Sequence, residues 1–205
     1  MPEVTRIYLV RHGEVTAEWS QRIYGDLDVP LSERGEQQSR DVAAIFEGQA
    51  LAAVYSSGLA RAEFAAGLLR APRGLERRDE ARLKEIFRGD WAGLDRAAVE
   101  ALEPGGWDKW WAQDGLVEPP GGETLAEIAA RVQEALADLA QRHAGESIAI
   151  VAHKWVLRAA SCAAFALPPE GMLRFEVPFV GAIALDWPAS GGRPALAAYG
   201  INQLS

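Results

Sequence analysis

The feature that most constrains the fold is a set of short, almost continuous apolar runs, each followed by a helical pattern. The runs are "TRIYLV" (5–10), "LAAVYS" (51–56) and "SIAIVA" (147–152), all of strand length. Strands of this kind are buried on both faces, as in a parallel sheet covered by helices. The sequence therefore predicts an α/β fold with a mostly parallel central sheet between two layers of helices.

The segments between these runs have the spacing of amphipathic helices. Ser32 can cap a helix that continues to Phe46, and a second helix is predicted over 59–70. The clearest helix covers 123–142, where apolar residues recur every three or four positions until Gly145. Further elements are expected as a buried helix over 155–167 and as strands near 172–177, 181–187 and 195–199.

Length and charge limit the kinds of partner. The chain of 205 residues can bury a core without disulfides, and we expect 1–205 to form a single domain. Its net charge of −8 argues against a nucleic-acid partner or an anionic membrane surface. The N-terminus lacks an export signal, and no apolar run is long enough to span a bilayer. The one cysteine, Cys162, suits a reducing compartment, so we expect a cytoplasmic protein.

Basic and imidazole side chains follow the ends of the three apolar runs. Arg11 and His12 come after the first run, Arg61 shortly after the second and His153 after the third. Open α/β sheets bind ligands at the carboxyl ends of their strands, so these side chains should meet. Guanidinium groups match phosphoryl oxygens, and a neutral imidazole can attack phosphorus. The pattern favours a phosphoryl-transfer site, whereas His143 is expected on the surface.

With their flanking residues, these positions resemble the histidine phosphatase superfamily, which includes the cofactor-dependent phosphoglycerate mutases. The resemblance covers nearly the whole chain and implies a phosphoglycerate mutase-like, three-layer α/β/α sandwich. Its motifs are "LVRHGEV", "RIYGDLDVPLSERGEQQS", "VYSSGLARAEFAA", "LKEIFRGDWAGL", "PPGGETLAEIAARV" and "IAIVAHKWVLRAA", in the family's order.

The resemblance implies a role for each matching residue. His12 would accept the phosphoryl group, with its second ring nitrogen bound to a backbone carbonyl near Gly13. The phosphate oxygens would be bound by Arg11, Arg61 and His153, and Glu85 would be the proton donor. No cofactor or metal is implied.

Glu14 is an alternative to Glu85 as the acid. We favour instead a pairing between Glu14 and a phosphate-binding arginine.

The sequence departs from the family pattern at several positions. Glu18 stands where many members have a phosphate-binding asparagine, and its carboxylate would repel phosphate unless it points away or pairs with Arg22. Lys154 and Trp155 follow the second histidine, where small glycines are common. Lys154 is solvated or adds charge at the pocket rim, whereas Trp155 is expected to pack in the core. Gly58 replaces a common aspartate, which should matter little.

A metal site is the competing chemical interpretation. His12, His153, Glu14 and Glu85 could in principle bind zinc. Arginines in the same site would oppose a dication, and no metal-binding motif such as HExxH is present. We therefore expect a metal-independent phosphatase.

The segment 95–123 bears on the substrate. It is more acidic than basic and contains Trp107, Trp110 and Trp111, which either pack as a lid or form a wall for an apolar leaving group. This composition disfavours phosphoglycerate. We expect a phosphomonoesterase for a small phosphorylated metabolite, and the arrangement also resembles the α-ribazole phosphatases. A mutase-type phosphotransferase and a catalytically weak phosphate-binding regulator are the alternatives, and a homodimer is left open.

Overall fold

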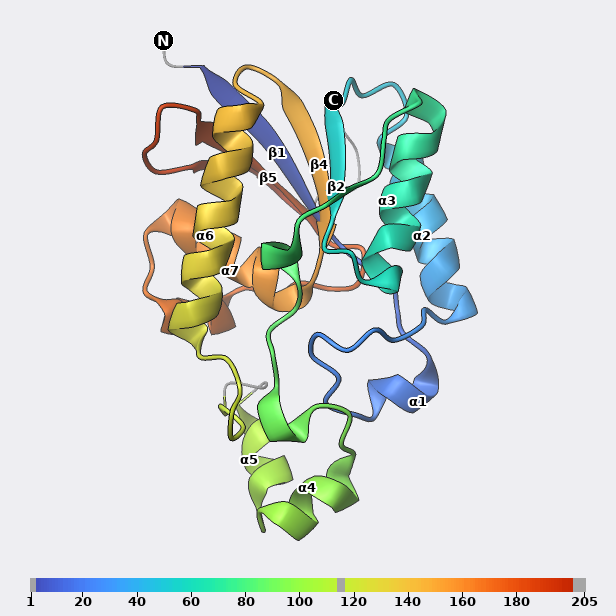
Figure 1. Cartoon of the computed structure of the whole chain (residues 1–205), viewed down its shortest axis with the longest axis vertical. Helices are drawn as coiled ribbons and strands as arrows, with labels where there is room; N and C mark the ends of the chain where they lie inside the picture. Colours follow the sequence, from blue (N-terminus) through green and yellow to red (C-terminus); the bar gives the residue numbers. More distant parts are fainter. Residues whose placement is uncertain (1–2, 114–116, 201–205) are drawn as a thin grey trace.

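A six-stranded sheet forms the centre of the structure, a computed structural model that describes residues 3–113 and 117–200 (Figure 1). The strand order is β3-β2-β4-β1-β5-β6. Neighbouring strands from β3 to β1 are parallel, whereas β5 runs antiparallel to both β1 and β6. The predicted, mostly parallel sheet is confirmed. The strands are β1 (Val4–Arg11), β2 (Ala53–Ser56), β3 (Arg78–Asp79), β4 (Ser147–Ala152), β5 (Ala182–Pro188) and β6 (Ala195–Tyr199).

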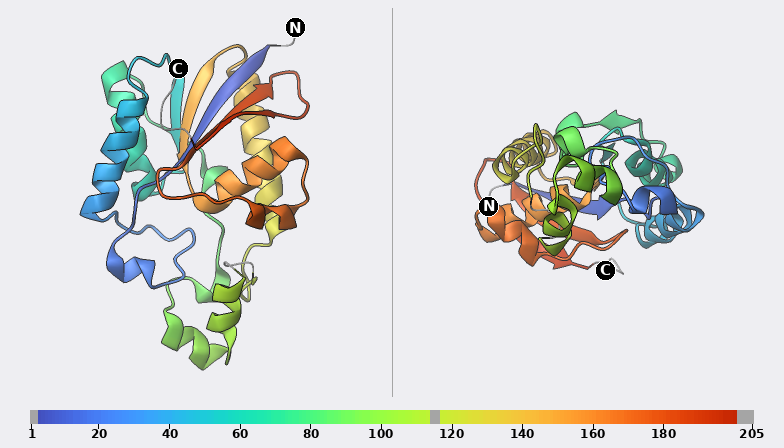
Figure 2. Two further views of the ribbon diagram at one scale, coloured as in Figure 1. Left: turned by 180° about the vertical axis from the view of Figure 1, so that it is seen from behind. Right: turned by 90° about the horizontal axis from the view of Figure 1, so that it is seen from below.

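Two pairs of helices cover the two faces of the sheet, as Figures 1 and 2 show. One layer holds α2 (Glu33–Ile45) and α3 (Ala60–Arg70), and the other holds α6 (Leu125–Arg142) and α7 (Lys154–Phe165). Side chains of a strand alternate between its faces. Ile7 and Leu9 accordingly pack in the core on the α6 and α7 side, whereas Tyr8 and Val10 pack on the α2 and α3 side. The three-layer sandwich is confirmed.

Capping side chains set the starts of α2 and α6. Ser32 accepts a hydrogen bond from the backbone N–H of Gly35 at 3.0 Å and begins α2 where the sequence predicts it. Thr124 and Glu127 form a reciprocal capping box that fixes the start of α6.

A smaller group of elements extends beyond the carboxyl ends of the parallel strands, at the bottom of Figure 1. It contains α1 (Ala17–Ser20), α4 (Arg96–Leu102) and α5 (Gly106–Ala112). Ile23, Trp91, Val99 and Trp110 form a separate small core there. The remaining short elements are the 3-10 helices η1 (Ala71–Arg73), η2 (Ala81–Leu83), η3 (Gly89–Trp91) and η4 (Pro169–Arg174).

The strand predicted at 172–177 is wrong. Its first half, residues 172–174, belongs to η4, which starts at a proline, and the chain then continues as a loop. Its apolar residues Met172 and Val177 are buried, which explains the strand-like pattern. Arginines bind backbone carbonyls here instead of a neighbouring strand: Arg158 donates to the carbonyl of Phe175 at 3.0 Å.

The surface position expected for His143 is also wrong. The residue is 6% exposed, and its ring lies between Tyr55 and Glu146. Nε2 is 2.9 Å from the Tyr55 hydroxyl, and Nδ1 is 2.7 Å from a Glu146 carboxylate oxygen. The polar ring is tolerated inside because both nitrogens have partners. None of the helices in the described part of the chain is long and apolar enough to cross a membrane.

Candidate active site

The register of the sheet brings the three strand ends together. Arg11 pairs with Ala152 across β1 and β4, and Ser56 pairs with Val151 across β2 and β4. The residues that follow these strands are therefore neighbours. The ring centroids of His12 and His153 are 5.1 Å apart, as the strand-end argument predicts.

His12 is held as a neutral imidazole with one defined tautomer. Its Nδ1 lies 2.7 Å from the carbonyl oxygen of Gly13. A carbonyl only accepts, so Nδ1 carries the proton and Nε2 keeps its lone pair. Burial, together with the guanidinium groups of Arg61 and Arg11, holds the pKa of His12 well below its ordinary value. The ring is therefore equipped to act as a nucleophile near neutral pH.

Arg61 and Arg11 are anchored by backbone carbonyls. Arg61 is fully buried in the first turn of α3 and donates to the carbonyls of Leu27 and Gly25, the latter at 2.7 Å. Arg11 donates to the carbonyl of Val177 at 2.6 Å. Burial lowers the pKa of both guanidinium groups, but arginine stays protonated in proteins. The two side chains place fixed positive charge beside the imidazoles.

His153 is the second buried imidazole of the site and occupies the N-cap position of α7, directly after β4. Its Nε2 is 2.7 Å from the hydroxyl oxygen of Ser57. Burial first, then the charge of Arg61, holds its pKa well below the ordinary value. The buried nitrogens His153 Nδ1, Arg61 Nε and Arg11 Nε have no hydrogen-bond partner among the described residues. Buried polar groups need partners, and these three could bind the oxygens of a phosphoryl group.

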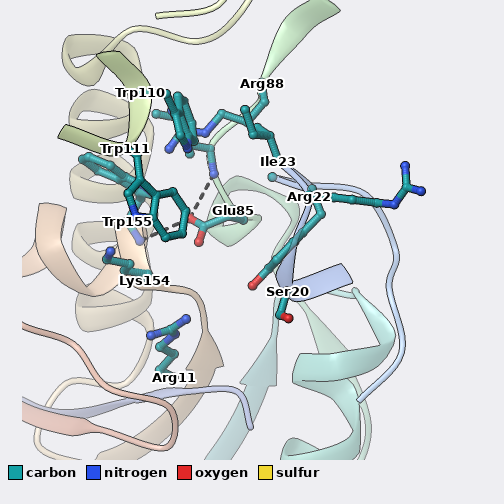
Figure 3. A pocket seen from close by; sticks show the side chains of 13 residues that line it. Arg11, Ser20, Arg22, Ile23, Glu85, Arg88, Trp110, Trp111, Lys154 and Trp155 are labelled. Carbon is teal, nitrogen blue, oxygen red and sulfur yellow. Dashed lines mark hydrogen bonds between the residues drawn. The ribbon is translucent and has the colours of Figure 1, made fainter. Parts of the chain in front are cut away.

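Glu85 lies in the loop after η2, with its carboxylate directed into the site (Figure 3). It is 8% exposed, and its Oε1 accepts from the backbone N–H groups of Ile86 at 3.1 Å and Trp155 at 3.2 Å. The carboxylate is thereby fixed between its own loop and the start of α7.

A pocket of about 430 Å³ opens beside Glu85 and Arg11 (Figure 3). Arg88 and Lys154 add positive charge to its lining. The guanidinium carbon of Arg88 lies 4.4 Å from the ring centroid of Trp110 and 5.2 Å from that of Trp155. Cations and aromatic faces thus line the space next to Arg11 and Glu85. The full lining is Arg11, Ser20, Arg22, Ile23, Tyr24, Gly25, Glu85, Ile86, Arg88, Trp110, Trp111, Lys154 and Trp155.

The segment 95–123 meets this pocket through tryptophans. Among its described residues, Trp110 and Trp111 alone line the pocket, and its acidic residues do not. Trp107 stacks on Trp111, with ring planes 8° apart, and lies outside the pocket. The acidic residues of the segment therefore do not set the charge of the pocket, and their number is no argument against an anionic substrate. Trp155 is 4% exposed, which agrees with its expected packing role.

The expected pairing of Glu14 with a phosphate-binding arginine is wrong. Its carboxylate accepts from the hydroxyl of Ser32 at 3.1 Å and lies 3.9 Å from the guanidinium of Arg34. The backbone N–H of Ser32 also donates to the carbonyl of Glu14 at 2.9 Å, so Glu14 lies against the start of α2 and does not line the pocket.

Glu18 is exposed on α1 and does not line the pocket. Arg22 pairs with Asp95 at 3.9 Å, and Figure 3 shows its guanidinium turned away from Glu85.

Three site residues were missed by the sequence analysis. Ser57 directly follows β2, so the strand-end argument could have selected it as the partner of His153. Tyr24 and Arg88 lie in irregular segments without a periodic signal. Among the described residues, no group of three or more His, Cys, Asp or Glu side chains is arranged to hold a metal ion.

The fold and the site are those of an enzyme that handles phosphate esters. The model of the histidine phosphatase superfamily (branch 1) matches residues 7–200. The chain belongs to this superfamily. It is a phosphatase that acts on a small phosphorylated metabolite through a phosphohistidine.

The relatives include both named phosphatases and a probable mutase. Phosphoserine phosphatase 1 of Hydrogenobacter thermophilus is 34% identical over 78% of this chain and 76% of its own. Glucosyl-3-phosphoglycerate phosphatase of Mycobacterium tuberculosis is 31% identical over 91% and 80%. A probable phosphoglycerate mutase of an Enterobacter species is 33% identical over 72% and 69%. Among solved structures, Bacillus stearothermophilus YhfR has a TM-score of 0.85 and 30% identity, covering 98% of both chains.

Proposed function

We propose that His12 is the residue that carries the phosphoryl group. The observation that supports this assignment is the hydrogen bond from Nδ1 to the Gly13 carbonyl, which leaves Nε2 unprotonated. Nε2 would attack phosphorus in line with the leaving oxygen. Arg11, Arg61 and His153 would bind the three non-bridging oxygens and stabilise their charge in the transition state.

Glu85 is the proposed general acid and base. As the bond from phosphorus to the leaving oxygen breaks, the Glu85 carboxyl would donate its proton to that oxygen. The resulting carboxylate would then take a proton from the water that attacks the phosphohistidine. Phosphate is released and His12 returns to its neutral state. The fixed position of Glu85 at the pocket supports this role, and Glu14 does not line the pocket.

His153 would act as a neutral donor. If the Ser57 hydroxyl donates to Nε2, the proton of the ring lies on Nδ1, the nitrogen without a partner. His153 could then donate to a phosphoryl oxygen without becoming charged, which agrees with its lowered pKa.

We extend the proposal to substrates whose leaving group carries a carboxylate. Arg88 and Lys154 line the part of the pocket that a leaving group would occupy. Two relatives are named for phosphoserine and glucosyl-3-phosphoglycerate, both of which contain a carboxylate. A hydrogen bond to a charged group contributes about 1.5–3 kcal/mol, or roughly ten- to a hundredfold in affinity.

The test is a set of matched phosphate esters with and without the carboxylate. O-Phosphoserine is compared with O-phosphoethanolamine, and 3-phosphoglycerate with glycerol 3-phosphate. We expect kcat/KM to be at least about tenfold higher for the carboxylates, with phosphate released and little interconversion of phosphoglycerates. Equal values would refute the substrate class, whereas predominant interconversion would identify a mutase. The His12→Ala variant should release no phosphate, and an inactive wild-type protein would favour a phosphate-binding regulator.

The proposal also covers the domain organisation and the cellular location of the protein. We propose that residues 1–205 form one domain and that the protein acts in the cytoplasm without a nucleic-acid or membrane partner. The net charge of −8 and the lone Cys162 support this setting.

A further inference from the structure

The loop that carries Glu85 is fastened to α6 by Arg131. Nη1 of Arg131 donates to the carbonyls of Arg82 at 2.6 Å and Lys84 at 2.8 Å, and Nη2 donates to the carbonyl of Glu85 at 3.4 Å. Nε and Nη2 also bind the two carboxylate oxygens of Glu123, the second at 2.7 Å. A guanidinium has five N–H donors in a rigid plane, and here each has an acceptor.

Glu123 holds the other side of the same loop. Its Oε2 accepts from the backbone N–H of Phe87 at 3.2 Å, and its own backbone N–H donates to the carbonyl of Phe87 at 2.9 Å. The Arg131–Glu123 pair therefore binds backbone groups on both sides of the Glu85 side chain. The two side chains are 22% and 13% exposed, and neither lines the active-site pocket.

The Glu85 carboxylate depends on where this loop lies. Its Oε1 bridges a backbone N–H of the loop, at Ile86, and one of α7, at Trp155. Movement of the loop relative to α7 would break this bridge and displace the carboxylate from the leaving oxygen. A displacement of about 1 Å can reduce a catalysed rate by roughly 10².

We propose that Arg131, paired with Glu123, is a positioning residue that sets the place of Glu85 for proton transfer. The inference rests on the proposed role of Glu85 as the acid. Lysine at position 131 would keep the positive charge but has three donors on a single nitrogen. It could not bind the Glu123 carboxylate and three separate carbonyls together. The Arg131→Lys variant therefore separates the effect of the positive charge at position 131 from the effect of holding the Glu85 loop in place.

The test compares Arg131→Lys and Glu123→Gln with a matched control, Arg73→Lys. Arg73 also binds backbone carbonyls, those of Phe46, Gln49 and Leu69, but it does so between the ends of α2 and α3. Single-turnover quench would measure formation of the phosphoenzyme from two substrates. One is p-nitrophenyl phosphate, whose leaving group needs little protonation, and the other is the fastest alkyl phosphate.

Both test variants should slow phosphorylation by the alkyl phosphate about 10- to 100-fold and by p-nitrophenyl phosphate less than about threefold. The control should change both rates equally or not at all. In a Glu85→Gln background, Arg131→Lys should have little further effect, because both changes act through the same proton. If one variant does not fold, the other carries the test.

Equal losses on the two substrates, or additive effects with Glu85→Gln, would refute the positioning role. If Glu85→Gln itself lacked the leaving-group selectivity, the acid assignment would be wrong instead.

Discussion

Gly13 and Gly35 allow the loop after β1 to lie directly against the first turn of α2. A Cβ added at Gly13 would lie 2.1 Å from the carbonyl oxygen of Gly35, and one added at Gly35 would lie 1.9 Å from the carbonyl oxygen of Glu14. An ordinary contact is at least 3.4 Å, so alanine at position 13 requires the two backbones to separate by about 1.3 Å (3.4 − 2.1). The moving segment includes the carbonyl that orients His12.

Gly13→Ala should therefore lower both stability and activity. Overpacking against backbone costs about 1–3 kcal/mol, which lowers Tm by roughly 2–4 °C per kcal/mol for a chain of this size. A shift of about 1 Å at the nucleophile should reduce kcat/KM by roughly 10². Thermal unfolding and steady-state kinetics measure the two effects.

Gly67→Ala is the matched control for this substitution. Gly67 lies inside α3, and an added Cβ would come no closer than 3.9 Å to the Arg70 guanidinium. Removing a helical glycine should raise stability by about 0.5–1 kcal/mol and leave activity unchanged. Wild-type rates and Tm in Gly13→Ala would refute the close approach of the two backbones at this site.

Further predictions concern the acid, the histidines and metals. Glu85→Gln should slow phosphorylation by an alkyl phosphate about 10²–10⁴-fold and by p-nitrophenyl phosphate much less, whereas the matched Glu14→Gln should leave both single-turnover rates unchanged. His12 and His153 have lowered pKa values in the fold, so the unfolded chain binds more protons below pH 6.5 and stability should fall as pH decreases from there. Urea unfolding should show that His12→Gln reduces this slope by up to about 1.4 kcal/mol per pH unit, and an unchanged slope would contradict a buried, neutral His12. Full turnover should persist after exhaustive chelation, because arginines supply the positive charge, and activity restored by zinc or magnesium would refute this.

The parts of the fold predicted well are those with strong local signals. Continuous apolar strands, the cap at Ser32 and the helical spacing of 123–142 are encoded in short segments, and they place the elements correctly. Strand ends at one edge of the sheet then bring His12 and His153 together, which requires only the parallel topology.

The sequence-based predictions fail where a polar atom is hydrogen-bonded by a residue that is distant in the sequence. The segment 172–177 mixes apolar and charged residues as a strand can, but arginines from β1 and α7 bind its carbonyls. His143, at the end of α6, is buried because Tyr55 of β2 supplies a partner. Glu14 was misplaced because the packing of Gly13 on Gly35, which directs it toward α2, is a tertiary contact. No periodic pattern encodes such pairings.

The most direct test of the account is to identify the phosphorylated residue. Quenching the enzyme without acid during turnover of a labelled substrate, followed by peptide mapping, should place label on His12. The linkage should be stable to alkali and labile to acid, and His12→Ala should trap none. Label on His153, on a serine or on an aspartate would contradict the account.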